Sequence, residues 1–273
     1  MNCLQHILSR IIGFLTHLRG GLITRLAIRC FVKQYQVNLA DAIHTEIVAY
    51  STFNDFFTRS LKPDVRPIPA ESSAIVSPAD GFICAFGSIE QEQIFQAKNH
   101  NYLLLQLLAN QQELVHHFLN GSFMTIYLSP KDYHRVHMPL AGQLSEMMYV
   151  PGRLFSVNQR AVENIPQLFA RNERMIALFN TTFGPMAIIM IGAMLVGSIT
   201  TQWHGVVTPP YGTTIKKWDY TQQNIYFEKG AEMGNFNMGS TVIVLLPAKQ
   251  GAWDPHLTIS QPIKMGEKIG SLL

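Results

Sequence analysis

The sequence has few cysteines, few charged residues and no apolar run long enough to cross a bilayer. Three cysteines in 273 residues are an odd number, and they lack the spacing of a metal site, which fits a reducing compartment. The apolar fraction is ordinary, so disorder is not expected, and a net charge of +3 is too small to indicate a nucleic-acid partner. The longest apolar run, residues 185–199, contains two glycines and predicts core strands rather than a membrane-spanning helix.

Acidic residues are absent from the first 40 positions, which carry five bases: Arg10, Arg19, Arg25, Arg29 and Lys33. Apolar residues recur at helical spacing on both sides of Gly20-Gly21, and this pattern predicts two amphipathic helices. Two basic amphipathic helices without acids indicate a surface that lies on anionic lipid, where each basic side chain contributes ~1 kcal/mol. The alternative is that the same helices pack against the protein's own core.

The pattern changes from helices to short strands near residue 72. Asn38 and Thr52 are expected to cap two further helices, the second over residues 53–61, and three prolines end the helical region. We therefore predict an α+β fold, with a helical membrane-associating region at 1–71 and a mostly antiparallel, barrel-like catalytic domain at 72–273. The clearest strands are expected at 74–76, 81–86, 123–128, 143–150, 174–179, 186–191 and 194–200, with a helix near 102–109 and two similar glycine turns at 229–234 and 264–270.

Gly239-Ser240 stands directly before a β-branched apolar run, residues 241–246, that predicts a strand buried on both faces. A flexible glycine next to a hydroxyl at the lip of a rigid strand suits a serine that attacks the peptide bond just before it. A lone Gly-Ser is more commonly a turn that enters a strand.

Asp80 and two histidines, His134 and His137, could complete such a site. Asp80 lies in the turn 77–81 and could orient a histidine, although Asp-Gly is also an ordinary turn signal. Histidine is the commonest general base near neutral pH, so an acid, a base and Ser240 would supply the three roles of a nucleophilic site. Structural histidines remain the alternative. A metal site would need ligands such as His116, His117 or His204, and no recognised zinc spacing connects them.

Seven motifs, taken in order, resemble the phosphatidylserine decarboxylase proenzymes of the short prokaryotic type. They cover nearly the whole chain, and Met238 departs from the leucine that this family most often has before Gly-Ser-Thr. The similar volume of the two side chains predicts little consequence. The motifs are Phe53-Asn54-Asp55-Phe56-Phe57-Thr58-Arg59, Asp64-Val65-Arg66-Pro67-Ile68, Pro78-Ala79-Asp80-Gly81, Asp132-Tyr133-His134-Arg135-Val136-His137-Met138-Pro139, Leu154-Phe155-Ser156-Val157-Asn158, Phe183-Gly184-Pro185-Met186-Ala187 and Gly239-Ser240-Thr241.

The resemblance implies a proenzyme that cuts itself between Gly239 and Ser240. Asp80, His137 and Ser240 would form the self-processing triad, and His134 would serve in decarboxylation and proton transfer. Ser240 would become a covalent pyruvoyl group, and no metal is implied. The products would be a β chain, residues 1–239, and an α chain, residues 240–273, that stay associated, with homodimerisation of the αβ unit left open.

The implied reaction converts phosphatidylserine to phosphatidylethanolamine and CO2 through a Schiff base on the pyruvoyl group, in phospholipid biosynthesis. The implied location is peripheral, on the cytoplasmic face of the cell membrane. Two other hypotheses remain at this point. One is a metal hydrolase that uses His134, His137 and either His116 or His117, and the other is a non-enzymatic scaffold on the membrane surface.

Overall fold

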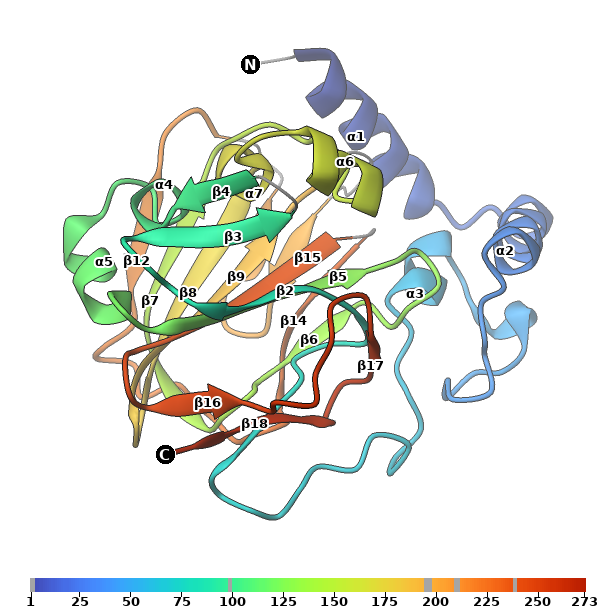
Figure 1. Cartoon of the computed structure of the whole chain (residues 1–273). Coiled ribbons are helices and arrows are strands. Elements are labelled where there is room, and N and C mark those ends of the chain that lie inside the picture. The colour runs from blue at the N-terminus through green and yellow to red at the C-terminus, as the bar shows by residue number, and fades with distance from the viewer. Residues whose placement is uncertain (1–2, 98–99, 194–197, 209–211, 238–239) are drawn as a thin grey trace.

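Figure 1 shows the computed structural model, in which helices come first and antiparallel sheets follow. The structure describes residues 3–97, 100–193, 198–208, 212–237 and 240–273. This order confirms the α+β class, while the sheets of the described residues stay open rather than closing into a barrel. The helices are α1 (Cys3–Thr16), α2 (Leu22–Tyr35), the 3₁₀ helix η1 (Ile47–Ala49), α3 (Phe53–Phe57), α4 (Leu104–Leu107), α5 (Gln112–Phe118), α6 (Gln159–Asn164) and α7 (Leu168–Arg171).

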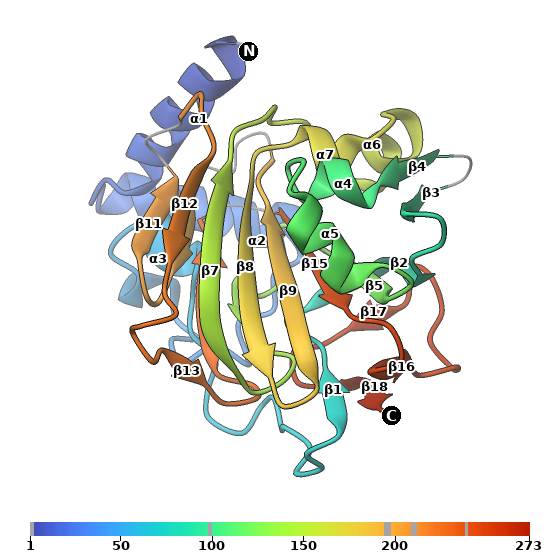
Figure 2. The same ribbon diagram turned by 90° about the vertical axis from the view of Figure 1, so that its left-hand side faces the viewer.

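A nine-stranded sheet forms the centre of the molecule. Its strands follow the order β12-β7-β8-β9-β15-β5-β2-β17, and β13 also pairs with β7. In Figure 2, α4 to α7 lie toward one side of this sheet and α1 and α3 toward the other. The strands are β12 (Lys216–Asp219), β7 (Gly142–Val150), β8 (Arg174–Thr181), β9 (Gly184–Ile191), β15 (Ser240–Leu246), β5 (Ser122–Leu128), β2 (Gly81–Ser88), β17 (Pro262–Ile263) and β13 (Tyr226–Phe227).

Three smaller sheets surround the large one. The first has the order β1 (Ala74–Val76), β18 (Lys268–Leu272), β16 (Gly251–Trp253), and the second has the order β11 (Gly205–Thr208), β10 (Ile199–Thr201), β14 (Glu232–Phe236), β6 (Arg135–His137). The third is the hairpin of β3 (Gln93–Ala97) and β4 (His100–Leu103). Because β14 is followed along the chain by β15, one short connection joins the second sheet to the central one.

Strand β15 occupies the middle of the large sheet because its sequence is apolar on both faces. It pairs antiparallel with β5 on one side and with β9 on the other. Val242, Ile243, Val244 and Leu245 are all fully buried, as expected for a strand that is covered on both faces. The hydrogen bonds on both edges and the buried side chains make this the most constrained strand of the sheet.

The N-terminal helices have their own small core, separate from that of the sheets. Ile28 of α2 packs there with Phe56 and Phe57 of α3. A capping box starts α3, because the Thr52 hydroxyl accepts from the Asp55 amide and the Asp55 carboxylate accepts from the Thr52 amide. By contrast, large apolar side chains of α1 and of the first turns of α2 are exposed: Ile7, Ile11, Phe14, Leu15, Leu22, Ile23 and Leu26.

Most of the expected elements are present, with three corrections. No helix follows Asn38, whose side chain accepts a hydrogen bond from the Ala40 amide in a turn that is followed by irregular chain. The two other expected helices are shorter, since α3 ends at Phe57 and residues 102–103 belong to β4. The strand expected at 194–200 begins only at Ile199, and residues 194–197 lie outside the described part of the chain.

Candidate active site

The start of β15 is the point around which the expected site residues can be placed. Ser240 pairs with Leu128 of β5, and Thr241 pairs with both Tyr127 of β5 and Ile191 of β9. The backbone of Ser240 is therefore fixed within the sheet. The side chain of Ser240 and the whole of Gly239 lie outside what the structure describes.

His134 lies next to this sheet edge. Its ring Nε2 donates to the carbonyl oxygen of Ser129, the residue after Leu128, over 3.0 Å, and its own carbonyl accepts from the Phe236 amide over 3.0 Å. The imidazole is completely buried and stacks on Phe57 of α3 with a centroid distance of 4.0 Å. Within the described part of the chain, the other ring nitrogen, Nδ1, has no hydrogen-bond partner. Burial and the nearby Arg59 cation lower the pKa of His134 to about 3, so the ring is neutral at neutral pH.

His137 lies three residues further along β6 and is held on both ring nitrogens. Nδ1 donates to the Gly230 carbonyl over 2.8 Å, so Nε2 is the unprotonated nitrogen and accepts from the Tyr133 hydroxyl over 3.0 Å. Burial lowers the pKa of His137, which keeps this imidazole neutral too. Its backbone amide donates to the Pro78 carbonyl. This tautomer leaves the basic lone pair on the nitrogen that faces Tyr133.

Asp80 forms a salt bridge with Arg66. The Arg66 guanidinium donates from Nε to one carboxylate oxygen over 3.0 Å and from Nη2 to the other over 2.5 Å. The Met265 amide adds a third hydrogen bond, and the Asp80 side chain is nearly buried. The hydrogen bonds to Asp80 raise the pKa of Arg66 further above its usual value. Since every contact to the carboxylate is a donor, the site is built for the ionised form of Asp80.

Two glycine turns supply the backbone groups that hold these side chains. Gly230 and Gly266 have positive φ angles of 80° and 85°, in the left-handed region that favours glycine. The first turn presents the carbonyl that binds His137, and the second contains the amide that binds Asp80. A Cβ on Gly230 or Gly266 would lie 2.7 Å or 2.8 Å from an atom of Ile68, so one side chain fills the space between the turns. The two similar glycine turns of the sequence therefore hold two members of the expected triad, His137 and Asp80.

The structure brings the predicted residues together only in part. Asp80 and His137 share the loop around Pro78, yet none of the hydrogen bonds of these two described side chains joins them. Along β14, the contact with His134 falls at Phe236 and the pairing with His137 at Glu232, so His134 lies further toward the end of β14 that leads to β15. Sequence reasoning gave no role to Arg66 or Tyr133, although both stand in the quoted motifs.

The other histidines considered as metal ligands lie elsewhere. His116 and His117 are exposed at the end of α5, and Nδ1 of the exposed His204 contacts the Tyr220 hydroxyl at 2.8 Å. Among the residues that the structure describes, no group of three or more histidine, cysteine, aspartate or glutamate side chains could hold a metal ion.

Comparisons with known proteins cover almost the entire chain. A family model described as phosphatidylserine decarboxylase matches residues 53–271, and a second, described as PSD, matches residues 5–36. A phosphatidylserine decarboxylase proenzyme of Pseudomonas fluorescens is 49% identical over 97% of this chain and 93% of its own length. Proteins of the same name from Methylococcus capsulatus and Vibrio cholerae are 49% and 48% identical, over 98% and 96% of this chain and 93% of theirs.

Proposed function

Because the chain belongs to the phosphatidylserine decarboxylase family, we propose that its chemistry is centred on Ser240 at the start of β15. The protein is a phosphatidylserine decarboxylase, a carboxy-lyase of phospholipid biosynthesis that is made as a proenzyme and uses a pyruvoyl group derived from its own chain. The full-length match to proenzymes of this activity carries the conclusion. The residue roles below extend it.

Self-cleavage is proposed at the bond between Gly239 and Ser240. In this step a base removes the Ser240 hydroxyl proton, and the oxygen attacks the Gly239 carbonyl, so that an ester replaces the amide. Loss of the α-proton of residue 240 then breaks the ester and releases residues 1–239 from residues 240–273. We assign the base to His137, whose unprotonated Nε2 would exchange the Tyr133 hydroxyl for that of Ser240, and the supporting charge to Asp80.

The surroundings of residue 240 fit a pyruvoyl group. The strand that carries it is hydrogen-bonded on both sides, which would hold the new chain end in place, and His134 offers a buried Nδ1 without a partner at the same edge. The group supplies an electron-withdrawing carbonyl that takes the amine of phosphatidylserine and accepts the electrons left when CO2 departs.

His134 is the residue that we propose to move a proton in decarboxylation. Its fixed Nε2–H and its stacking on Phe57 orient Nδ1, while burial keeps the ring neutral. An anionic headgroup brought next to the imidazole would raise the pKa of His134, because a nearby negative charge stabilises the protonated ring. The substrate would thus prepare its own proton carrier.

Separate assays of cutting and of decarboxylation test these assignments. Ser240→Ala should remain a single uncut chain and release no CO2 from phosphatidylserine, as judged by intact mass and radiolabelled CO2. His137→Gln should stay uncut, whereas His134→Gln should be cut and then lose at least 100-fold in kcat. The reverse pattern, with His134→Gln uncut and His137→Gln cut, would transfer the base role to His134, which lies nearer to the start of β15.

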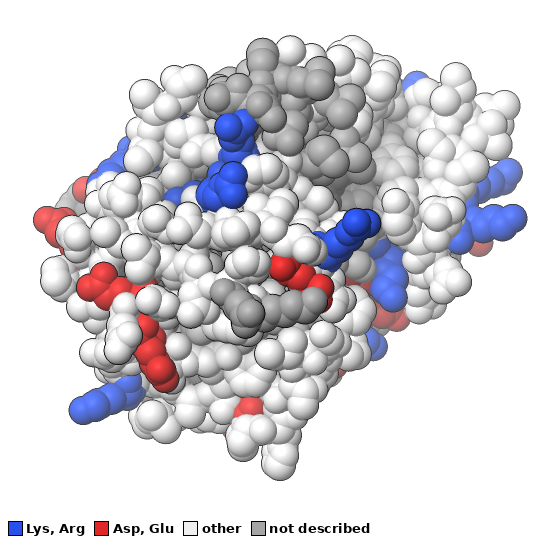
Figure 3. All heavy atoms as spheres, turned by 45° about the horizontal axis from the view of Figure 1, so that its top comes forward, with Lys and Arg blue, Asp and Glu red and all other residues white. Residues whose placement is uncertain are grey.

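We further propose that residues 1–71 bring the enzyme to the cytoplasmic face of the membrane and that residues 72–273 form the catalytic domain. No helix among the described residues is long and apolar enough to span a bilayer. The exposed apolar side chains of α1 and α2, together with a basic and acid-free N-terminal sequence, support contact with an anionic lipid surface. Figure 3 views the molecule with the end where α1 lies turned forward and shows a largely uncharged face on which both basic and acidic groups are scattered.

Vesicle flotation tests the membrane proposal. The triple variant Arg25→Gln, Arg29→Gln, Lys33→Gln should bind vesicles with 30% anionic lipid at least 10-fold more weakly than wild type, since each base near the surface contributes about 1 kcal/mol. A matched variant of three bases outside this region, Lys216→Gln, Lys217→Gln, Lys249→Gln, should bind like wild type. Equal binding of both variants would contradict the proposal.

A further inference from the structure

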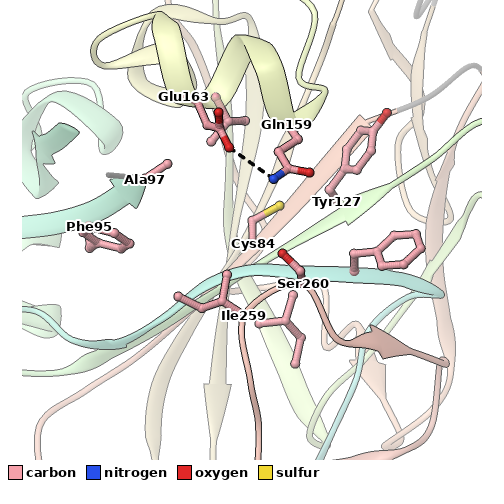
Figure 4. A pocket seen from close by; sticks show the side chains of 11 residues that line it. Cys84, Phe95, Ala97, Tyr127, Gln159, Glu163, Ile259 and Ser260 are labelled. Carbon is pink, nitrogen blue, oxygen red and sulfur yellow. Dashed lines mark hydrogen bonds between the residues drawn. The ribbon is translucent and has the colours of Figure 1, made fainter. Parts of the chain in front are cut away.

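A largely apolar cavity of about 540 Å³ lies beside β2 and β5. Figure 4 shows its side chains projecting from β2, β3, α6 and the loop before β17. Phe82 and Cys84 come from alternate positions of β2, Tyr127 from β5 and Val162 from α6. The two most polar lining groups satisfy each other, because the Gln159 amide donates to the Glu163 carboxylate over 3.1 Å. The space between is suited to an uncharged, apolar ligand.

This cavity reaches the strand that carries the reactive residue. Tyr127 pairs with Phe82 on one side and with Thr241 on the other, so these three side chains share one face of the sheet. Thr241 directly follows Ser240. In Figure 4 the Tyr127 ring stands beside the start of β15, on the far side of the hollow from Phe95.

The mouth of the cavity combines exposed apolar side chains with a cation. Phe95 and Ile259 are 38% and 54% exposed, which is unusual for large apolar residues beside a hollow. The Lys131 ammonium lies 5.7 Å from the centre of the Phe82 ring, in the turn that follows β5. The Lys131 ammonium and the start of β15, where Thr241 pairs with Tyr127, therefore both lie beside residues that line the hollow.

We propose that this cavity binds one fatty acyl chain of the phospholipid substrate, an inference that rests on the function proposed above. These features correspond to the groups of a glycerophospholipid, with the tail in the hollow, the phosphodiester near Lys131 and the amine at residue 240. A volume of about 540 Å³ lies within the range of sites that bury a whole small ligand, so the hollow is large enough for a long stretch of one acyl chain. Burial raises the pKa of Cys84 to about 12, so the thiol stays neutral and acts as apolar lining.

Variants that fill the hollow test the assignment, each with a neighbour as control. Cys84→Phe and Gln159→Trp place bulk inside it, whereas Phe86→Trp two positions further along β2 and Arg160→Trp on the same helix lie outside its lining. Binding of the fluorescent fatty acid cis-parinaric acid should weaken at least 10-fold in the filling variants and less than 2-fold in the controls. KM for dipalmitoyl phosphatidylserine in mixed micelles should rise at least 10-fold in the filling variants, while KM for the dihexanoyl lipid changes less than 2-fold.

Unchanged parinarate affinity together with unchanged KM for the long-chain lipid would overturn the proposal, as would equal increases of KM for both chain lengths. Because Asp80 and His137 do not line the hollow, the filling variants should be cut completely, and the cut chain reports that they fold. If wild type itself failed to cut and to release CO2, the proposed function would fall. The parinarate measurement would then still decide whether the hollow takes an acyl chain.

Discussion

Arg66 holds Asp80 through both carboxylate oxygens, and His137 is held instead by Gly230 and Tyr133. The acid that sequence reasoning paired with the histidine is thus paired with a guanidinium, whose other nitrogen contacts Asp41. The charge of Asp80 still acts on His137 at longer range. Burial lowers the pKa of His137, and the negative charge of Asp80 offsets a part of that lowering. The positive charge of Arg66, which is paired with Asp80, reduces the effect of the Asp80 charge on His137.

Removing the Arg66 guanidinium should destabilise the fold and slow cutting. Arg66→Met leaves a nearly buried carboxylate without its cation, which typically costs about 3 kcal/mol, and Arg66→Lys should cost less because one contact survives. Urea unfolding and the rate of appearance of the α chain measure the two effects. Asp41→Asn is the control, since it removes only the more exposed partner and should cost less than about 1 kcal/mol. Equal losses in Arg66→Met and Asp41→Asn would contradict this account.

The Tyr133 hydroxyl should tune the basicity of His137. Tyr133→Phe removes the donor to Nε2, so the neutral ring loses a hydrogen bond and the pKa of His137 rises. The lower limb of the profile of cutting rate against pH should move to higher pH, and stability should fall by about 1 kcal/mol. Tyr226→Phe, an exposed position, should leave the profile in place. A profile that did not move in Tyr133→Phe would show that His137 is not the base.

Gly230→Ala should impair cutting because the turn that holds His137 has no room for a side chain. The added Cβ would meet Ile68 at 2.7 Å in a backbone that already has a positive φ angle. Gly205→Ala provides the matched control, since Gly205 has a similar φ of 77° with nothing within 4 Å of the added Cβ. We expect cutting to slow at least 10-fold in Gly230→Ala and to remain near wild type in Gly205→Ala. Equal rates would show that the fit of this turn around Ile68 is unimportant.

Glu173 should make stability fall as pH rises. Its carboxyl accepts from Tyr149 and Thr208, and burial raises the pKa of Glu173 from 4.5 to about 7. Between these two values the folded protein keeps a proton that the unfolded chain has lost, so the contribution of this group to the free energy of unfolding decreases from pH 4.5 to 7.

The variant Glu173→Gln should lose that dependence. The difference between the unfolding free energies of wild type and variant should change by up to about 3 kcal/mol between pH 4.5 and 8, with the variant relatively more stable at the higher pH. Urea denaturation at each pH measures it, and the groups common to both proteins cancel. Parallel curves for wild type and variant would contradict the prediction.

The sequence predicted the central strand well because β15 is apolar throughout and needs no knowledge of its neighbours. Capping chemistry likewise located the start of α3 at Thr52. The same reasoning failed at Asn38, where the side chain closes a turn instead of starting a helix. Both residues have the same local preference, and only the later sequence, which packs phenylalanines of α3 against α2, separates them.

Site geometry was less accessible from sequence because, apart from Tyr133, the partners of Asp80 and His137 are distant in sequence or are backbone atoms. The Gly230 carbonyl and the Met265 amide have no side-chain signature, and only the echo between their turns pointed to them. Arg66 stood in a quoted motif, yet the pairing of a cation with a carboxylate 14 positions away follows from the path of the chain rather than from either residue.

Because β15 lies in the middle of the central sheet, the proposed cut makes folding of the precursor different from refolding of the mature enzyme. Before the proposed cut, the strand folds into the sheet as part of one chain, and its search for β5 and β9 is intramolecular. Afterwards it belongs to a short separate chain that also contributes β16, β17 and β18, so loss of that chain would remove strands from two sheets, the nine-stranded and the three-stranded one. Once denatured, the two chains would have to meet in solution before β15 could return to its place between β5 and β9. The unpaired edges of those two strands would tend to aggregate in the meantime. If the chain is cut as proposed, the mature enzyme forms by folding of the uncut precursor and does not re-form from its two separated chains. Its lifetime would then depend on its rate of unfolding rather than on a folding equilibrium.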